Sequence, residues 1–286
     1  MKTYLDCYPC LMRQALQASR FADLNESTQQ KILNCVMQSL AELPEGASPP
    51  VIAQQIHRIV RAESGHTDPY RDVKVTSTNN ALSWYDTLRK QIDESGDPVD
   101  LAIRLSIAGN IIDFGVSEHY DLEDSIHRVV TKPLAVNDIE SLKTKLKTVS
   151  SLLYLGDNSG ETVFDRLLIE TLAEHYALPV TYVVRGSATI NDVTYIEAKE
   201  AGLNEVCSEI IDNGSDAPGT LLEDCSAEFV SRFNQAELII AKGQGNFESL
   251  SGIHAPLFFL LQAKCNVIAN ELGVKELDLI VKESQA

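Results

Sequence analysis

The sequence predicts an α/β protein, in which a three-layer α/β/α domain with a mainly parallel sheet is preceded by a helical N-terminal region. Apolar residues of the first half repeat at helical spacing, whereas the second half alternates short apolar runs with helical patterns. That alternation favours a parallel sheet covered by helices on both faces. We expect a helical region over residues 1–149 and an α/β domain over residues 150–286, sharing one cleft because no flexible linker separates them.

The helical region is predicted to contain at least four helices. Asn25 provides an N-cap before the first apolar repeat, Pro49 opens a second helix and Gly65 follows its end. His57 falls on the polar side of that second helix and is expected at the surface. A third tract and a fourth helix, which starts at Pro98, are indicated by apolar residues at helical spacing: Leu82, Trp84, Tyr85, Leu88, Leu101 and Leu105.

The strands of the α/β domain are predicted from short apolar runs bounded by polar or turn residues. Helical patterns separate most of these runs. The expected strands cover residues 151–155, 180–184, 205–211, 238–241, 256–261 and 277–281.

Composition limits the classes of function. The chain has 286 residues, of which 44% are hydrophobic, with 24 basic and 41 acidic residues and a formal charge of -17. This charge repels the phosphates of nucleic acids, so a general nucleic-acid partner is not expected. The sequence contains no apolar run long enough to cross a bilayer and no apolar signal segment, which predicts a cytoplasmic protein with no membrane partner. Composition does not reveal the oligomeric state.

The most informative stretch is Gly156-Asp157-Asn158-Ser159-Gly160-Glu161, which follows the first predicted strand and precedes a helix. Ligands of open α/β sheets bind at such strand-to-helix turns, where the next helix offers unpaired N–H groups to an anion. The same residue types also suit an ordinary turn or helix cap, so this stretch alone does not define a site.

Two further polar clusters follow predicted strands. Arg185, with Asp192 shortly beyond it, follows the run over 180–184, and Lys242-Gly243-Gln244-Gly245-Asn246 follows the run over 238–241. Parallel strands would gather these clusters at one edge. The glycine-rich segment has neither the Walker A order nor a dinucleotide fingerprint, which excludes those two nucleotide-binding motifs.

The gathered side chains predict metal and phosphate chemistry. Carboxylate and amide oxygens are hard ligands, and we therefore assign Asp157, Asn158 and Asp192 to a divalent metal. Such an ion can polarise a phosphoryl oxygen and activate a water molecule for attack on phosphorus, while Lys242 or Arg185 neutralises phosphate oxygens. Gly243 lets the backbone approach an anion closely. Oxygen ligands do not distinguish manganese, magnesium, cobalt and nickel.

The chain resembles the metal-dependent damage-control phosphatases, formerly catalogued as a domain of unknown function. The resemblance spans nearly the whole chain, and the N-terminal Cys-x-x-Cys makes it most similar to the prokaryotic branch that carries such a pair. The motifs that carry it are Cys7-Tyr8-Pro9-Cys10, Ala108-Gly109-Asn110-Ile111-Ile112-Asp113, Gly156 to Glu161, Arg185-Gly186, Asn191-Asp192, Asp212 to Thr220 and Ala241 to Glu248.

The resemblance implies hydrolysis of small phosphate monoesters, such as sugar phosphates or damaged and surplus phosphometabolites, with a divalent metal in the cleft. By resemblance, Asp157, Asn158 and Asp192 are the metal ligands and Lys242 the phosphate-binding lysine. These four residues are the expected catalytic set. Glu161 and Glu248 are candidate second-layer or general-base groups, and a helix-end cap is the alternative role for Asn110 and Asp113. The expected phosphate-binding set comprises Lys242, Arg185, Asn110, Asp113, Ser159, Gly243 and Asn246.

The six cysteines predict reduced thiols rather than a disulfide framework. Cys7 and Cys10 have the spacing of a soft-metal clamp or a redox pair, and Cys265 is the one additional thiol considered with them. These three residues define a candidate auxiliary thiol site, for which a purely structural contact is the competing interpretation.

Two alternative functions remain open at this point. The first is S-adenosylmethionine-dependent methylation of protein carboxyl groups, although no methyltransferase glycine loop with a ribose-binding acid is recognised. The second is a non-enzymatic thiol module for metal binding or redox chemistry, centred on Cys7 and Cys10. The two alternatives require different residues from the phosphatase, so substitution of Asp157 or Cys7 distinguishes them.

Overall fold

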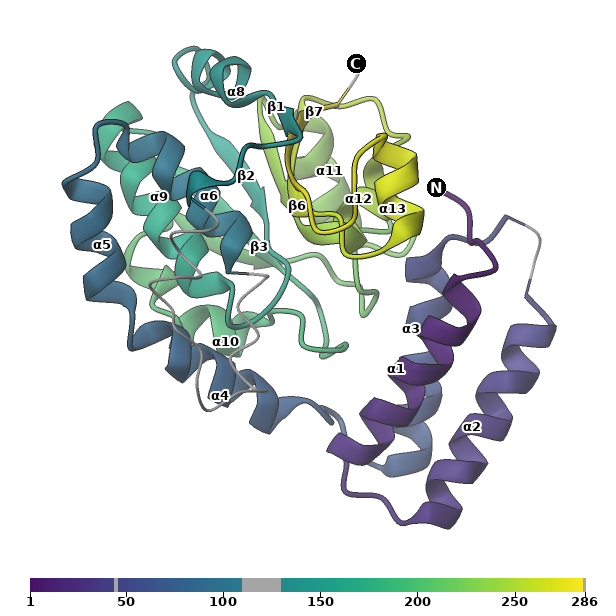
Figure 1. The fold of residues 1–286 in the computed structure, drawn as a ribbon. Helices are drawn as coiled ribbons and strands as arrows, with labels where there is room; N and C mark the ends of the chain where they lie inside the picture. Colours follow the sequence, from purple (N-terminus) through teal and green to yellow (C-terminus); the bar gives the residue numbers. More distant parts are fainter. Residues whose placement is uncertain (44–45, 110–129, 285–286) are drawn as a thin grey trace.

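The computed structural model describes residues 1–43, 46–109 and 130–284 of the chain. Helices α1, α2 and α3 form a separate bundle beside the α/β domain, and α4 leads from this bundle to the helices that cover the sheet (Figure 1). The described helices are α1 (Cys7–Phe21), α2 (Glu26–Ala41), α3 (Pro49–Ser64), α4 (Arg71–Leu82), α5 (Tyr85–Asp93), α6 (Pro98–Ala108), α8 (Ile139–Leu146), α9 (Thr162–Tyr176), α10 (Tyr195–Glu200), α11 (Ala227–Gln235), α12 (Gly243–Leu250) and α13 (Asn266–Leu272).

One seven-stranded sheet has the order β1-β7-β6-β5-β2-β3-β4. Its neighbouring strands are parallel except for the pair β6 and β7. The predicted α/β class with a mainly parallel sheet and a helical N-terminal region is therefore confirmed. The strands are β1 (Val136–Asn137), β2 (Leu152–Leu155), β3 (Val180–Val184), β4 (Glu209–Asp212), β5 (Ile239–Lys242), β6 (Leu257–Gln262) and β7 (Leu279–Glu283).

The two faces of the sheet bury separate apolar cores, because successive side chains of a strand point to opposite faces. Leu152 and Tyr154 of β2 pack on the face covered by α5, α6, α8 and α9. Leu153 and Leu155 pack on the other face with α11, α12 and α13. A third core holds α1, α2 and α3 together, and Ile190 of the α/β domain packs against it. The bundle therefore touches the segment between β3 and α10.

Some local expectations were wrong. The tract expected as a single helix is interrupted at Ser83 and Trp84, where the Trp84 amide donates to the Ala81 carbonyl at 3.1 Å in a tight turn. The strand expected over 205–211 begins at Glu209, because a 3₁₀ turn (Leu203–Glu205) follows Gly202 in the left-handed region, with φ of 83°.

His57 is buried rather than exposed. The polar side of α3 is covered at this position, where the Tyr70 ring lies 6.0 Å from the imidazole between ring centroids. Among the described residues, none of the helices combines the length and apolar character needed to cross a membrane.

Candidate active site

The predicted polar clusters meet at the carboxyl edge of the sheet. Asp157 and Asn158 follow β2, Arg185 follows β3, and Lys242 ends β5. The strand β2 lies between β3 and β5. The chain continues from β2 to β3 and β4 on one side, and from β5 to β6 and β7 on the other side. Such a switch point separates the two following loops and opens a crevice beyond the strand ends. The sheet topology thus explains why residues far apart in sequence converge here.

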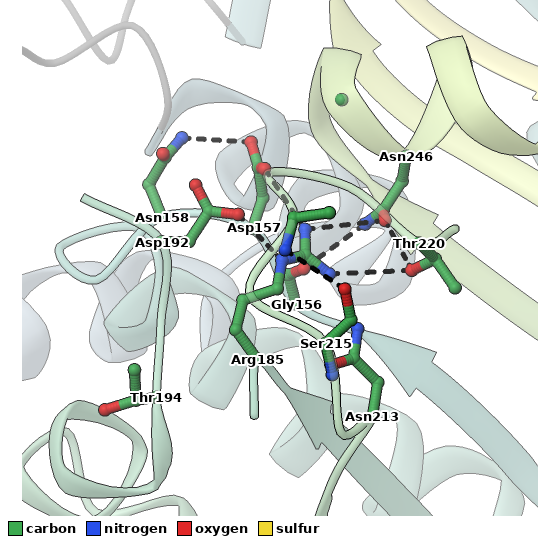
Figure 2. A network of polar contacts seen from close by, with 12 residues as sticks. Gly156, Asp157, Asn158, Arg185, Asp192, Thr194, Asn213, Ser215, Thr220 and Asn246 are labelled. Carbon is green, nitrogen blue, oxygen red and sulfur yellow. Dashed lines mark hydrogen bonds and ion pairs between the residues drawn. The ribbon is translucent and has the colours of Figure 1, made fainter. Parts of the chain in front are cut away.

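Asp157, Asn158 and Asp192 form the centre of the site. The Asn158 side-chain amide donates to Asp157 Oδ2 at 2.9 Å, and an isolated antiparallel bridge pairs Asn158 with Asp192. The amide N–H of Val193 donates to the Asp157 carbonyl at 2.8 Å, which fixes the segment that carries Asp192. Figure 2 shows the Asn158 amide turned toward the Asp157 carboxylate, with the Asp192 carboxylate beside them.

The Arg185 guanidinium links the carboxylates of Asp157 and Asp192. Its Nε donates to Asp192 Oδ2 at 2.7 Å, and its guanidinium lies 4.0 Å from Asp157 Oδ1. The remaining guanidinium nitrogens reach Thr220 Oγ1 and Asn246 Oδ1, each at 3.5 Å (Figure 2). Arg185 is almost completely buried, so its charge is held close to the acidic centre.

Lys242 lies fully buried between carboxylates. Its ammonium donates to Glu161 Oε1 at 2.5 Å, to Asp165 Oδ1 at 2.6 Å and to the Ser106 carbonyl at 2.8 Å. Burial opposes the positive charge, but the Asp165 and Glu161 carboxylates outweigh burial and raise the pKa of Lys242. Glu161 in turn accepts from the Asn158 amide at 3.3 Å. Lys242 is therefore connected to the centre through Glu161 and Asn158.

Burial strongly affects the acids of the site. It raises the pKa of Asp192 to about 6, against the opposing influence of Arg185. Burial likewise raises the pKa of Asp157, opposed first by Lys264 and then by Arg185. The pKa of Glu161 and that of Glu248 are each raised to about 7, again chiefly by burial. Burial thus disfavours the negative charge of these acids, and a bound cation would offset that cost.

Gly243 is required sterically beside Asp157. Its φ is 78°, and a Cβ at this position would lie 1.9 Å from Asp157 Oδ2. Any larger residue would displace the carboxylate or the turn that begins α12. Gly243 was expected to let the backbone approach a bound anion. In the structure it lies against the Asp157 carboxylate instead.

A cavity of about 500 Å³ opens onto this centre. Asp157, Asn158 and Asp192 form one part of its wall. The N-terminal bundle contributes another part through residues of α1 and the start of α3, and the segment around α13 contributes Lys264 and Cys265. The candidate auxiliary thiols Cys7, Cys10 and Cys265 all line this cavity, so the structure brings them to the same cleft as Asp157 and Asp192.

Several predicted phosphate-binding residues are engaged inside the protein. The Ser159 hydroxyl donates to the Asn191 carbonyl at 2.9 Å, and the Asn246 amide donates to the Lys242 carbonyl at 2.8 Å. Of the described candidate residues, Glu248 lines the cavity. The cavity wall does not include Ser159, Asn246, Arg185, Lys242 or Glu161. Asn110 and Asp113 lie outside the described residues.

Lys264 is the residue that sequence reasoning missed. It is exposed, lines the cavity and is the basic group with the strongest opposing effect on the raised pKa of Asp157. The backbone N–H of Lys264 donates to Gln244 Oε1 at 3.3 Å, which connects the Lys264 segment to α12. The available signal was its position after β6, the next parallel strand beyond β5.

Comparison with known proteins finds relatives that match almost the whole chain. The family model described as the damage-control phosphatase ARMT1-like domain matches residues 3–280. A damage-control phosphatase of Pyrococcus horikoshii is 33% identical over 277 residues, covering 96% of this chain and 95% of the relative. A damage-control phosphatase of Archaeoglobus fulgidus is 34% identical over 287 residues, covering 96% and 97%. The crystal structure of a DUF89 family protein from P. horikoshii matches with a TM-score of 0.93 and 32% identity over 100% of both chains.

Proposed function

Because the chain belongs to the damage-control phosphatase ARMT1-like domain family, we infer that it is a phosphatase acting on small phosphorylated metabolites that are damaged or in surplus. The enzyme hydrolyses phosphate esters and depends on a metal. The relatives do not favour a carboxyl methyltransferase or a non-enzymatic thiol module. The observation that carries the assignment is the group Asp157, Asn158 and Asp192, which lines a cavity at the carboxyl edge of the sheet.

The residues of this centre fit a divalent metal ion. Asp157 and Asp192 provide buried carboxylates with raised pKa, and Asn158 provides an amide oxygen, a set suited to a hard cation. We propose these three residues as the metal ligands, with manganese, magnesium, cobalt or nickel as the ion. When bound, the ion would supply Lewis-acid polarisation of a phosphoryl oxygen and acidification of water.

Lys264 is proposed to bind the phosphate group. The charge of Lys242 is directed to Glu161 and Asp165, and that of Arg185 to Asp192, so both cations support the acidic centre from inside the protein. Lys264 instead lines the cavity, where its ammonium can neutralise a phosphate oxygen. This division gives Lys242 and Arg185 a positioning role in place of the phosphate contact expected from sequence.

Glu248 is proposed to handle a proton of the reaction. It lines the cavity, and its Oε1 accepts from Gln244 at 2.8 Å. A carboxyl group with pKa of about 7 can donate a proton to the departing alcohol near neutral pH. Glu161 is held by Lys242 and Asn158 and is proposed to orient Asn158.

We propose that the bundle of α1, α2 and α3 and the edge of the sheet form two walls of one cleft, while β1, which also precedes residue 150, belongs to the sheet. Residues of α1 and α3 line the cavity together with the acidic centre, and we propose that the helical bundle selects the organic portion of the substrate. The sheet edge supplies the groups that hold phosphate and metal.

The decisive experiment is phosphate release from an aryl phosphate and a panel of sugar phosphates by chelated enzyme resupplied with one divalent metal at a time. We expect metal-dependent turnover that falls at least about 100-fold in Asp157→Ala and in Asp192→Ala, because each change removes a ligand and a charge. Glu228→Ala, on the exposed surface of α11, is the control. Circular dichroism must show that the variants fold, and equal turnover in the wild type and both aspartate variants would contradict the proposed centre.

A further inference from the structure

Three cysteines from separate parts of the chain line the active-site cavity. Cys7 and Cys10 lie in the first turns of α1, and Cys265 immediately precedes α13. All described cysteines are free thiols. The thiols of Cys7 and Cys10 lie near enough to Cys265 for its charge to influence the pKa of both. The cluster therefore occupies one wall of the cleft that contains Asp157 and Asp192.

The helix α1 holds Cys7 and Cys10 in a favourable relation for reaction with each other. Residues three positions apart are neighbours on a helix surface, with about 5–6 Å between their Cβ atoms. A disulfide needs a Cβ separation of about 3.5–4.5 Å, so a small adjustment of the first helical turn is sufficient. Asp6, the N-cap residue, makes no side-chain hydrogen bond to that turn. The turn thus lacks one of the usual restraints on its conformation.

Exposure distinguishes Cys10 from the other described cysteines, all of which, Cys7 included, are partly buried. Cys10 is exposed and its Sγ accepts a hydrogen bond from Gln14 Nε2 at 3.8 Å. Burial raises the pKa of Cys10, but Arg13 opposes that effect. By contrast, burial raises the pKa of Cys207 and that of Cys225 each to about 12, which leaves little thiolate at neutral pH. A thiol-reactive compound will therefore meet Cys10 before either of these two.

We propose that Cys7 and Cys10 form a thiol modification site in the wall of the active-site cleft, which reacts with low-molecular-weight disulfides such as glutathione disulfide. The Cys10 thiolate attacks one sulfur of the reagent, forming a mixed disulfide and releasing one thiolate. The Cys7 thiolate then attacks the Cys10 sulfur, forming the protein disulfide and releasing the second thiolate. The two cysteines are oxidised, the reagent is reduced to two thiols, and the cysteine protons pass through solvent to the released thiolates.

The modification alters the phosphatase site directly, a consequence that rests on the proposed function. A mixed disulfide on Cys10 introduces a bulky group into the cavity that the phosphate ester must enter. Closure of the Cys7–Cys10 disulfide then reshapes the first turn of α1, which forms part of the same wall. Turnover of the oxidised enzyme is expected to fall at least about tenfold and to return after treatment with dithiothreitol.

The test exposes the reduced, full-length enzyme to glutathione disulfide and follows two readouts. Peptide mass spectrometry is expected to detect first a glutathione adduct on Cys10 and then a Cys7–Cys10 disulfide with two fewer hydrogen atoms. Cys7→Ser should stop at the adduct, and Cys10→Ser should form neither species. Cys35→Ser, which changes a thiol of α2, should react like wild type. Adducts confined to other cysteines, or a disulfide joining Cys10 to Cys265, would overturn the assignment.

The second readout compares phosphate release by each variant in its oxidised form with release by the same variant in its reduced form. A proven Cys7–Cys10 disulfide with unchanged turnover would overturn the proposed effect on the active site. The mass measurement needs no substrate, so the absence of phosphatase activity in every reduced sample would reject the proposed function while leaving the thiol chemistry measurable. The two failures are therefore distinguishable.

Discussion

Arg185 donates a hydrogen bond from Nε to Asp192 Oδ2 at 2.7 Å, and both side chains are almost completely buried. This contact fixes the orientation of one proposed metal ligand. The same guanidinium contacts Thr220 and Asn246, so the position of Asp192 also depends on the segments after β4 and β5. The proposed metal centre is consequently supported by a network that spans three strand ends.

Replacement of Arg185 by methionine tests this support. The variant keeps a long side chain but removes the donor to Asp192, so metal affinity is expected to fall about 10-fold to 100-fold, as for other groups that orient metal ligands. Isothermal titration calorimetry with manganese measures the change. Arg232→Met is the control, because Arg232 pairs with Glu209 and Glu228 on the surface. Equal manganese affinity in the Arg185 variant and the wild type would contradict the supporting role.

Replacement of Lys242 by methionine should destabilise the fold. Glu161 and Asp165 would lose a buried cation, and removal of one partner from a buried ion pair costs about 3–5 kcal/mol. Urea unfolding measures the free energy of unfolding. Lys31→Met, which breaks an exposed pair with Glu63, should cost at most about 1 kcal/mol.

A second substitution separates the electrostatic effect from packing. Adding Glu161→Gln to Lys242→Met removes one uncompensated carboxylate, so the double variant should regain part of the lost unfolding free energy. If the two substitutions simply add their costs, the proposed neutralisation of Glu161 by Lys242 is wrong.

Lys264→Ala tests the proposed phosphate contact. Loss of the ammonium should raise KM by about tenfold, since a charge-assisted hydrogen bond contributes about 1.5–3 kcal/mol. Metal affinity should change much less, because Lys264 is not a proposed ligand. Steady-state kinetics at saturating metal and a metal titration give the two values. Lys275→Ala, on an exposed lysine of the turn before β7, is the control. Unchanged kinetics with every phosphate ester would reject the assignment.

The sequence was sufficient to predict the central strands because β2, β3, β5 and β6 are short apolar runs buried between helices. It did not indicate β1, whose two residues are too few to display a period, or the antiparallel direction of β7. The direction of β7, which lies between β1 and β6, depends on how the chain returns over the sheet. That information is not contained in the local pattern of apolar residues.

The convergence of Asp157, Asn158 and Asp192 could be anticipated from parallel strand order, but the surroundings of Lys242 could not. The local sequence around Lys242 does not specify whether its side chain faces a ligand or the interior. Its direction here follows from Glu161 and Asp165, which α9 brings beside the end of β5 from about 80 residues away. Lys264 was missed for a related reason, since only the folded cavity reveals that it lies near Asp157.

Gly243→Ala should abolish most activity through a steric effect. The new Cβ would lie 1.9 Å from Asp157 Oδ2, and the residue would retain an unfavourable φ of 78°. We expect turnover to fall at least about 100-fold, as occurs when a catalytic group is displaced by about 1 Å. Gly252→Ala is the matched control, because no atom lies within 4 Å of its added Cβ. Phosphate release by both variants, with circular dichroism to verify folding, decides whether this close approach matters.

His57→Phe should make the stability of the protein less dependent on pH. Burial, aided by the charge of Arg61, lowers the pKa of folded His57 from 6.5 to about 4, so the folded state holds the neutral imidazole. Below pH 6.5 the unfolded chain binds a proton that the folded protein excludes, and stability is lost as pH falls toward 4. The loss attributable to His57 is about 3 kcal/mol across this window.

Urea unfolding at pH 7, 6, 5 and 4 measures this contribution. The phenylalanine variant retains an aromatic ring beside Tyr70 but has no group to titrate, so its unfolding free energy should decline less steeply below pH 6.5 than that of wild type. His66→Phe, at an exposed position after α3, is the control for the loss of an imidazole. Parallel pH profiles for wild type and the His57 variant would mean that the buried imidazole does not couple folding to proton binding.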